Sequence, residues 1–190
     1  MICGIDEAGR GPLAGPVCAA AVILPKDFPV EILGDSKKLS EKQRNYAMQA
    51  VYQRGIAWGI GWASAAEIDC LNILKASLLA MKRAFEFIQS ACASPLGAQN
   101  IEAVVDGLYV PDIAVPCRAL VKADSLVPSV MAASILAKTA RDRMMLRYSW
   151  LYPEYHYEKH KGYPTREHRE ILLKLGPSPI QRMSFRYKKE

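Results

Sequence analysis

The 190-residue chain has no apolar run long enough to cross a membrane as a helix. A transmembrane helix needs about 18 or more consecutive apolar residues, whereas residues 17–24 form a much shorter run that follows Asp6, Glu7 and Arg10. The first residues also lack a basic region followed by an apolar stretch and a cleavage site, which is the pattern of a secretion signal. We therefore expect no membrane partner and a cytoplasmic location.

Cysteine is scarce and widely spaced, with five residues and no CxxC pair. This spacing argues against a zinc site and against a redox motif. Cys3 and Cys18 stand in apolar, strand-like runs, where a free thiol behaves as a small core residue. The odd number of cysteines favours a reducing compartment.

Internal repeats and low-complexity segments are also lacking, and 51% of the residues are hydrophobic. A chain of this size and composition forms one domain, or a domain with an appendage. Lysine and arginine number 25 against 19 acidic residues, and the basic residues of the tail are Arg182, Arg186, Lys188 and Lys189. Such an excess suits a polyanionic partner, although it also serves ordinary solubility.

Strand-like and helix-like patterns follow one another in an order typical of α/β proteins. Apolar runs predict strands at residues 2–5, 17–24, 56–63, 101–105 and 118–121. Helices are predicted at 41–54 and 65–70, each behind a capping box, and at 72–92, 128–148 and 166–175. We expect a loop at 152–164 and an irregular tail at 177–190.

These elements predict a mixed sheet, antiparallel at one edge and parallel at the other. The first two strands are expected to form a hairpin-like pair, and Gly59 and Gly61 in the third strand allow another backbone to approach closely. Helix 128–148 is rich in alanine and is expected to have a narrow packing face, formed by Met131, Ala132, Ile135 and Ala137.

Two adjacent acids, Asp6 and Glu7, stand at the end of the first apolar run, before a Gly9-Arg10-Gly11-Pro12 turn. In a regular strand their side chains would point to opposite faces. The glycines and the proline predict that the strand stops here, which would free Glu7 to turn toward Asp6. Acids beside a cationic glycine-rich turn suggest hard metal ions and phosphate, and an exposed acidic pair is the alternative.

Two more acids, Asp106 and Asp124, follow the fourth and fifth predicted strands. Ligands of open α/β sheets gather beyond the carboxyl ends of the strands, so parallel pairing would bring all four acids together. Four such carboxylates need cations to stay ionised, and an all-oxygen set without His or Cys favours Mg²⁺ or Mn²⁺. Two ions roughly 3.5–4 Å apart can promote phosphodiester hydrolysis.

Each later acid also has a structural alternative. Asp124 precedes a helix and could serve as its N-cap, and Asp106 before Gly107 could be a turn residue. A fifth acid, Asp142, lies on helix 128–148 between Arg141 and Arg143, where we expect an exposed acid paired with arginine.

Six motifs in order along the chain resemble those of the ribonuclease HII family, the type 2 ribonucleases H of bacteria. They are DEAGRGPLAGPV at 6–17, DSKKL at 35–39, IDCLN at 68–72, VVDG at 104–107, KADSLVPSVMAASILAKTARD at 122–142 and HKGYPT at 160–165. The motifs cover nearly the whole chain. Two positions depart from the family pattern: Gln181 stands where histidine is frequent, and His156 stands where glycine is common.

The resemblance implies a ribonuclease H-like fold in residues 1–150, with a five-stranded mixed sheet flanked by helices, and a small helical extension with a basic tail in 151–190. It also implies an endonuclease that cleaves RNA in RNA/DNA hybrids, and we expect the protein to act as a monomer. In duplex DNA such an enzyme cuts on the 5′ side of single ribonucleotides, as ribonucleotide excision repair requires, and leaves 3′-hydroxyl and 5′-phosphate ends. Two divalent ions, Mn²⁺ or Mg²⁺, serve the reaction.

The family's metal-binding and catalytic acids match Asp6, Glu7, Asp106 and Asp124. Its Gly-Arg-Gly motif matches Gly9, Arg10 and Gly11, and with a tyrosine that matches Tyr163 it reads the 2′-hydroxyl, the group that distinguishes RNA from DNA. Taken alone, Tyr163 could instead cap the core. Further candidates for phosphate contact are Ser36, Lys37, Lys38, Asn72, Ser134, Lys138, Thr139, Arg141 and Lys161. For each lysine and arginine taken singly, a solvated surface charge is the favoured alternative.

Two other functions share some of these features. Another nuclease of the same fold, such as a junction resolvase or an exonuclease, would use the same acids without a 2′-hydroxyl sensor. A module that binds hybrids without cleaving them would not need the complete acid set. Substrate preference and cleavage in the presence of metal separate these alternatives.

Overall fold

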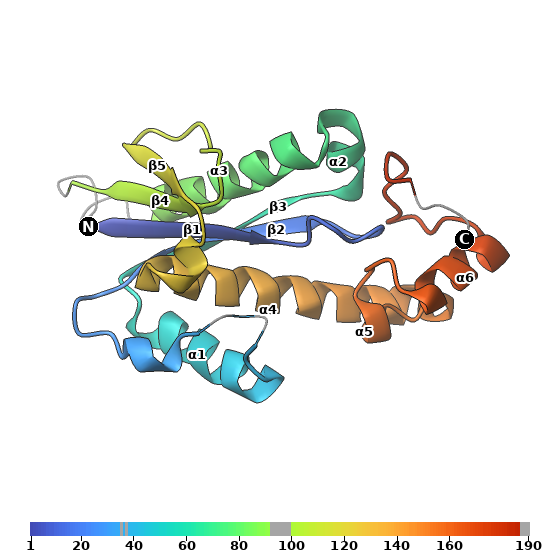
Figure 1. Ribbon diagram of the computed structural model, residues 1–190, viewed down its shortest axis with the longest axis horizontal. Coiled ribbons are helices and arrows are strands. Elements are labelled where there is room, and N and C mark those ends of the chain that lie inside the picture. Colours follow the sequence, from blue (N-terminus) through green and yellow to red (C-terminus); the bar gives the residue numbers. More distant parts are fainter. Residues whose placement is uncertain (35, 37, 92–99, 187–190) are drawn as a thin grey trace.

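A computed structural model describes residues 1–34, 36, 38–91 and 100–186 of the chain. Its centre is a five-stranded sheet in the order β3-β2-β1-β4-β5 (Figure 1). The strands are β1 (Ile2–Ala8), β2 (Val17–Ile23), β3 (Ala57–Ala63), β4 (Glu102–Asp106) and β5 (Cys117–Leu120). The three N-terminal strands are antiparallel, whereas β4 and β5 run parallel to β1. The predicted mixed sheet is therefore confirmed.

The first strand is longer than the sequence predicts. It continues through Asp6 and Glu7, which pair with Ala20 and Ala19 of β2, so the expectation that the strand stops before these acids is wrong. The glycines and the proline act later, in the connection 9–16 between β1 and β2. That connection is wider than the tight turn of a hairpin.

Helices cover both faces of the sheet (Figure 1). One face carries α2 (Ala65–Leu71) and α3 (Ile73–Ala91), and the other carries α4 (Pro128–Leu151) with α1 (Glu41–Arg54) packed against it. Both predicted capping boxes are present, because Ser40 and Ser64 each accept a hydrogen bond from the backbone N–H three residues later. Within the described part of the chain, no helix is both long and apolar enough to cross a membrane.

Two apolar layers hold these helices on the sheet. On one side α3 buries Phe85 and Ile88 against the sheet, and on the other α4 buries Ile135 and Leu136. Each large apolar side chain that is fully buried contributes about 1.5–3 kcal/mol to stability. The sheet is therefore stabilised from both faces, and its carboxyl edge is positioned by that packing.

The helix α4 has no narrow packing face, so that expectation is wrong. Residues on several of its sides are buried, because the sheet, α1 and the C-terminal residues all contact it. The small side chains of Ala132, Ala133 and Ala137 allow this close contact on more than one side.

The C-terminal residues fold back along the far end of α4. Residues 152–164, predicted as a loop, contain two short helical turns, η3 (Pro153–Tyr155) and α5 (Tyr157–His160), which precede α6 (Arg166–Leu175). His156 and Lys161 end these turns with a left-handed backbone at φ 50°, a conformation that favours glycine. This geometry explains why glycine suits position 156. Residues 177–186 are irregular, as predicted, and form an isolated bridge from Gln181 to Ala14.

Two glycines of β3 allow α3 to approach the sheet, as predicted from their spacing. A β-carbon at Gly61 would lie 2.1 Å from the carbonyl oxygen of Ala80, and one at Gly59 would lie 2.3 Å from that of Ala84. Both contacts are far inside van der Waals distance, so any side chain there would displace the helix.

We predict that Gly61→Ala lowers the free energy of unfolding by about 1–3 kcal/mol or more, the usual cost of overpacking a core. Gly34→Ala is the control, because its β-carbon would meet the flexible Leu39 side chain at 3.4 Å. Urea unfolding followed by circular dichroism measures both variants. Equal stabilities for the two would show that α3 can move away from the sheet at little cost.

Candidate active site

The four predicted acids line one cavity of about 520 Å³ at the carboxyl ends of the parallel strands β1 and β4. Side chains from the polar loop before α1, from α1 itself, from α4 and from the C-terminal residues complete its wall. The lining residues are Asp6, Glu7, Ala8, Ser36, Arg44, Asp106, Asp124, Ser134, Lys138 and Tyr163. The structure therefore brings together acids that lie up to 118 positions apart in the sequence, from Asp6 to Asp124.

The end of β1 explains how two neighbouring acids reach the same cavity. The pairing between β1 and β4 ends at Ile5 and Val105, whereas β2 continues to pair with β1 through Ala8. Beyond Ile5, therefore, β1 has a neighbouring strand on one side only. Asp6 and Glu7 lie at this open edge, so Glu7 does not have to leave the strand.

Asp106 and Asp124 are connected through the backbone. The carboxylate of Asp106 accepts a hydrogen bond from the Ala123 backbone N–H at 2.8 Å, and the short helix η2 (Ala123–Ser125) carries Asp124. The alternative that Asp124 caps the following helix is wrong, because Val127 is the N-cap of α4 and makes no side-chain capping bond. Asp106 thus holds the turn that brings Asp124 to the cavity.

Burial and mutual repulsion make the carboxylates of Asp6 and Glu7 costly to ionise. Asp6 is only 5% exposed, and burial, followed by the charge of Glu7 and more weakly that of Asp106, raises its pKa well above the ordinary value. Burial also raises the pKa of Glu7, although Arg10, which donates a hydrogen bond to it at 3.3 Å, opposes the rise. A site of this kind favours a cation.

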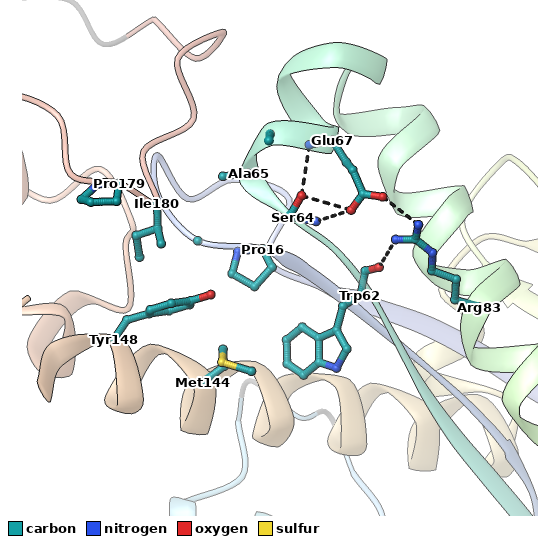
Figure 2. A pocket seen from close by; sticks show the side chains of 12 residues that line it. Pro16, Trp62, Ser64, Ala65, Glu67, Arg83, Met144, Tyr148, Pro179 and Ile180 are labelled. Atoms are coloured by element: carbon teal, nitrogen blue, oxygen red, sulfur yellow. Dashed lines mark hydrogen bonds and ion pairs between the residues drawn. The ribbon is translucent and has the colours of Figure 1, made fainter. Parts of the chain in front are cut away.

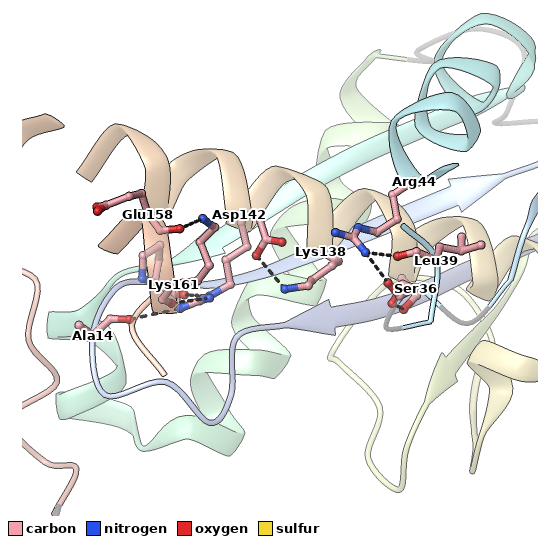
Figure 3. Close-up of polar contacts among 11 residues, drawn as sticks. Ala14, Ser36, Leu39, Arg44, Lys138, Asp142, Glu158 and Lys161 are labelled. Carbon is pink, nitrogen blue, oxygen red and sulfur yellow. Dashed lines mark hydrogen bonds and ion pairs between the residues drawn. The ribbon is translucent and has the colours of Figure 1, made fainter. Parts of the chain in front are cut away.

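Polar groups on the cavity wall lie where a phosphate could enter. The hydroxyls of Ser36 and Ser134 are 2.9 Å apart, and Lys138 donates to Asp142 at 2.8 Å (Figure 3). Asp142 was expected to be exposed and paired with arginine; instead it is largely buried and its partner is this lysine. The pair holds the ammonium group of Lys138 at the cavity.

Other candidates for phosphate contact lie elsewhere or have structural tasks. Asn72 accepts hydrogen bonds from the N–H groups of Leu74 and Lys75 and so caps α3. Lys161 donates to the Glu158 carbonyl (Figure 3), Thr139 is buried, and Lys38 is exposed outside the cavity wall. Lys37 lies outside the described residues.

Tyr163 and the Gly9–Gly11 turn are neighbours, as the sensor hypothesis requires. A β-carbon at Gly11 would lie 3.9 Å from the Tyr163 ring, and the Leu13 N–H donates to the Gly162 carbonyl at 2.8 Å. The ring is 38% exposed and lines the acid cavity, with the Lys138 ammonium 5.9 Å from its centroid. Tyr163 is therefore placed where a nucleotide beside the acids could reach it.

Arg141, a candidate for phosphate contact, lies inside the protein. It is 1% exposed and donates hydrogen bonds to the carbonyls of Ala14, Pro16 and Lys161. A β-carbon at Gly9 would overlap its guanidinium, at 2.0 Å from Nε. The buried guanidinium thus stabilises the turn from the protein interior. The residue type did not predict this role, because arginine side chains are mostly exposed.

Arg182, one of the basic residues of the tail, is likewise buried, at 0% exposure. It donates to four carbonyls of the connection 9–16. Burial and the nearby Arg141 charge lower its pKa to about 9, which leaves it protonated at neutral pH.

A second cavity, of about 410 Å³, lies between β3, α4 and residues 179–180 (Figure 2). Its wall is mostly apolar, and its acid, Glu67, is 2.7 Å from Arg83. Hydrogen bonds from Arg83 and Ser64 lower the Glu67 pKa to about 2. Because these charges are already paired, the carboxylate cavity is the stronger candidate for chemistry.

Comparison with known proteins assigns the family. The family model described as Ribonuclease HII matches residues 3–188. Ribonuclease HII of Treponema denticola is 56% identical over 193 residues, which cover 97% of this chain and 98% of that protein. Ribonuclease HII of Dechloromonas aromatica is 49% identical over 97% of this chain and 90% of its own length.

Solved structures share the fold. The PCNA:RNase HII complex from Archaeoglobus fulgidus contains a chain that matches with a TM-score of 0.76 and 24% identity, covering 100% of this chain and 97% of that one. Bst-RNase HIII in complex with Mn²⁺ matches with a TM-score of 0.71 and 20% identity, over 92% of this chain and 62% of that one. With the carboxylate cavity and the sequence relatives, this fold identifies the chain as a member of the ribonuclease HII family, a family of ribonuclease H enzymes.

Proposed function

We propose that the protein is a metal-dependent endonuclease that cleaves RNA in RNA/DNA hybrids and on the 5′ side of single ribonucleotides in duplex DNA. It leaves 3′-hydroxyl and 5′-phosphate ends. The observation that carries the proposal is the cavity that joins four carboxylates to Tyr163 beside the Gly9–Gly11 turn. In this proposal residues 1–150 supply the acids, and the extension 151–190 supplies Tyr163.

The donor set of the cavity suits Mg²⁺ or Mn²⁺. All four acids present oxygen, and burial with mutual repulsion raises the pKa of both Asp6 and Glu7, a cost that a divalent cation would relieve. Among the described residues, no three acidic, histidine or cysteine side chains converge as a ready-made ligand group. Magnesium suits such a site, because it is usually held by one or two carboxylates and keeps several waters.

Two divalent ions bound here would activate a water and stabilise the leaving 3′-oxygen. Asp6, Glu7 and Asp106 would hold them, and Asp124 would complete the set or orient the water. Because a protein of the same fold, Bst-RNase HIII, has been solved with Mn²⁺, Mn²⁺ belongs with Mg²⁺ in any test.

The chain's own residues would orient the substrate. Lys138, held by Asp142 at the cavity, would neutralise a phosphate, and the Ser134 hydroxyl would donate to a phosphate oxygen. Tyr163 would pack on the ribose and offer its hydroxyl, while the Gly9–Gly11 backbone would approach the 2′-hydroxyl.

A panel of labelled duplexes tests the proposal: all-DNA, all-hybrid, and DNA with one ribonucleotide, each with Mg²⁺, Mn²⁺ or EDTA. We expect metal-dependent cuts in the two RNA-containing duplexes, and on the 5′ side of the lone ribonucleotide. Asp106→Asn should lower turnover by a factor on the order of 10²–10³. Cleavage of the all-DNA duplex would favour a resolvase or exonuclease, and binding without cleavage would favour a hybrid-binding module.

Asp6→Asn is predicted to raise the melting temperature in EDTA at pH 7 by a few degrees. A raised pKa in the folded state means that the ionised Asp6 destabilises the fold above its ordinary pKa of about 4. The gain should therefore shrink as the pH falls toward 4, and Mn²⁺ should stabilise the variant less than the wild type. Asp112→Asn is the control, because this exposed acid is paired with Lys82 and should give no gain. A melting temperature of Asp6→Asn at or below the wild-type value would contradict the electrostatic argument.

Tyr163→Ala is predicted to lower kcat/KM about tenfold at a single ribonucleotide, and less on a continuous hybrid, because it removes a stacking and hydroxyl contact. The melting temperature should change little for a ring that is 38% exposed. Tyr46→Ala, at an exposed tyrosine of α1, is the matched control. A clear loss of stability with unchanged cleavage would mean that Tyr163 caps the core.

A further inference from the structure

The connection 9–16 depends on one side chain for much of its hydrogen bonding. Arg182 Nε donates to the Gly15 carbonyl at 2.8 Å, and Nη1 donates to the Arg10 carbonyl at 2.9 Å. Nη2 donates to the Gly9 carbonyl at 2.6 Å and to the Pro16 carbonyl at 3.2 Å. Every nitrogen of this buried guanidinium is thus bonded to the turn.

The residues around Arg182 fix it in place. We call residues 178–186 the C-terminal strap, which runs beside the connection between β1 and β2 (Figure 1). The Arg182 N–H donates to the Leu13 carbonyl at 2.9 Å, and Asp69 of α2 accepts from the N–H groups of Met183 and Ser184, both at 2.9 Å. The strap is therefore attached at Arg182 itself and at the two residues that follow it.

Because the peptide bond is planar, these contacts also fix the direction of the neighbouring N–H groups of the turn. In a trans peptide the C=O and N–H groups point in opposite directions, and no peptide bond in the described residues is cis. Because the carbonyls of Gly9 and Arg10 point at Arg182, the N–H groups of Arg10 and Gly11 point away from it. Within the described part of the chain, neither of these N–H groups donates to another residue.

We propose that Arg182 is a positioning residue for ribonucleotide recognition, which directs the N–H groups of Arg10 and Gly11 toward the 2′-hydroxyl of the substrate. This inference rests on the proposed function. It assigns to the C-terminal strap the task of setting the selectivity for a single ribonucleotide, through a turn that is distant in sequence. Arg182 itself is buried and touches no substrate.

Arg182→Lys is the main variant, because lysine keeps the charge but lacks the planar fork that bonds four carbonyls at once. Asp69→Asn is a milder second variant, which weakens the attachment of the strap and leaves Arg182 in the chain. Phe85→Leu, in the core under α3, controls for lost stability, and Arg166→Ala, at a 93% exposed side chain, controls for the loss of an arginine that does not contact the turn.

Two measurements follow for each variant in parallel. The first is the amide ¹H–¹⁵N spectrum of the metal-free protein, read at Arg10 and Gly11. The second is the ratio of kcat/KM on the single-ribonucleotide duplex to kcat/KM on the continuous hybrid, together with the melting temperature. The spectrum reports on the turn without any need for activity.

We expect Arg182→Lys to shift both amide signals and to lower the selectivity ratio about tenfold, the effect of losing one hydrogen bond to a charged group. Asp69→Asn should change the amide signals and the selectivity ratio in the same direction, but by less. The two controls should leave the selectivity ratio unchanged even if they lower the melting temperature. Unmoved amide signals, or an unchanged ratio, in Arg182→Lys would overturn the proposal. If Arg182→Lys does not fold, Asp69→Asn decides by the same two criteria.

A failure of the proposed function gives a different result. In that case the wild type cleaves neither RNA-containing duplex, and the recognition role of Arg182 falls with it. If the wild type cleaves both duplexes and the variants keep its ratio, the proposed function stands and only the role of Arg182 is overturned.

Discussion

The parallel pairing of β1 with β4 is the constraint on which the site depends. It places the carboxyl ends of both strands at one edge, so that Asp6, Glu7 and Asp106 face a common cavity. The charges repel one another and resist burial, as the raised pKa of Asp6 records. The apolar layers on both faces of the sheet offset this cost, because their packing holds the strands in place despite the repulsion between the carboxylates.

The β1–β2 connection is the least regular part of the site and is held by side chains. Its carbonyls lie beyond the sheet ladder, and those that are buried must be bonded. Two arginines supply the donors: Arg141 from α4 and Arg182 from the C-terminal strap. A buried guanidinium without a carboxylate partner is costly unless its N–H groups are hydrogen-bonded. The same hydrogen bonds therefore stabilise both the buried arginines and the turn.

This arrangement couples the two ends of the chain to one function. Tyr163 comes from the C-terminal third, whereas Asp6, Glu7 and Asp106 come from the strands. The turn after β1 is bonded to the C-terminal residues through Gly162 and Arg182. A change in the strap is therefore transmitted to the turn by hydrogen bonds to its backbone. In the proposed function, selectivity and stability of the site would depend on the same contacts, so the two must be measured separately.

The sequence by itself determined the elements and the acids. Apolar periodicity located the strands, capping boxes marked α1 and α2, and the position of Asp6, Asp106 and Asp124 near strand ends indicated that they would meet. Six motifs in order also determined the family. These signals are local, because each depends on residues within one element or one turn.

The tertiary structure alone decided the length of β1, the breadth of packing around α4 and the roles of Arg141 and Arg182. Glu7 stays in the strand because β2 continues to pair where β4 has ended. The two arginines are buried because carbonyls more than 100 positions away satisfy them. Hydrogen bonds over such separations leave no local pattern, so the residue type gave no indication that the fold uses these two arginines as internal donors.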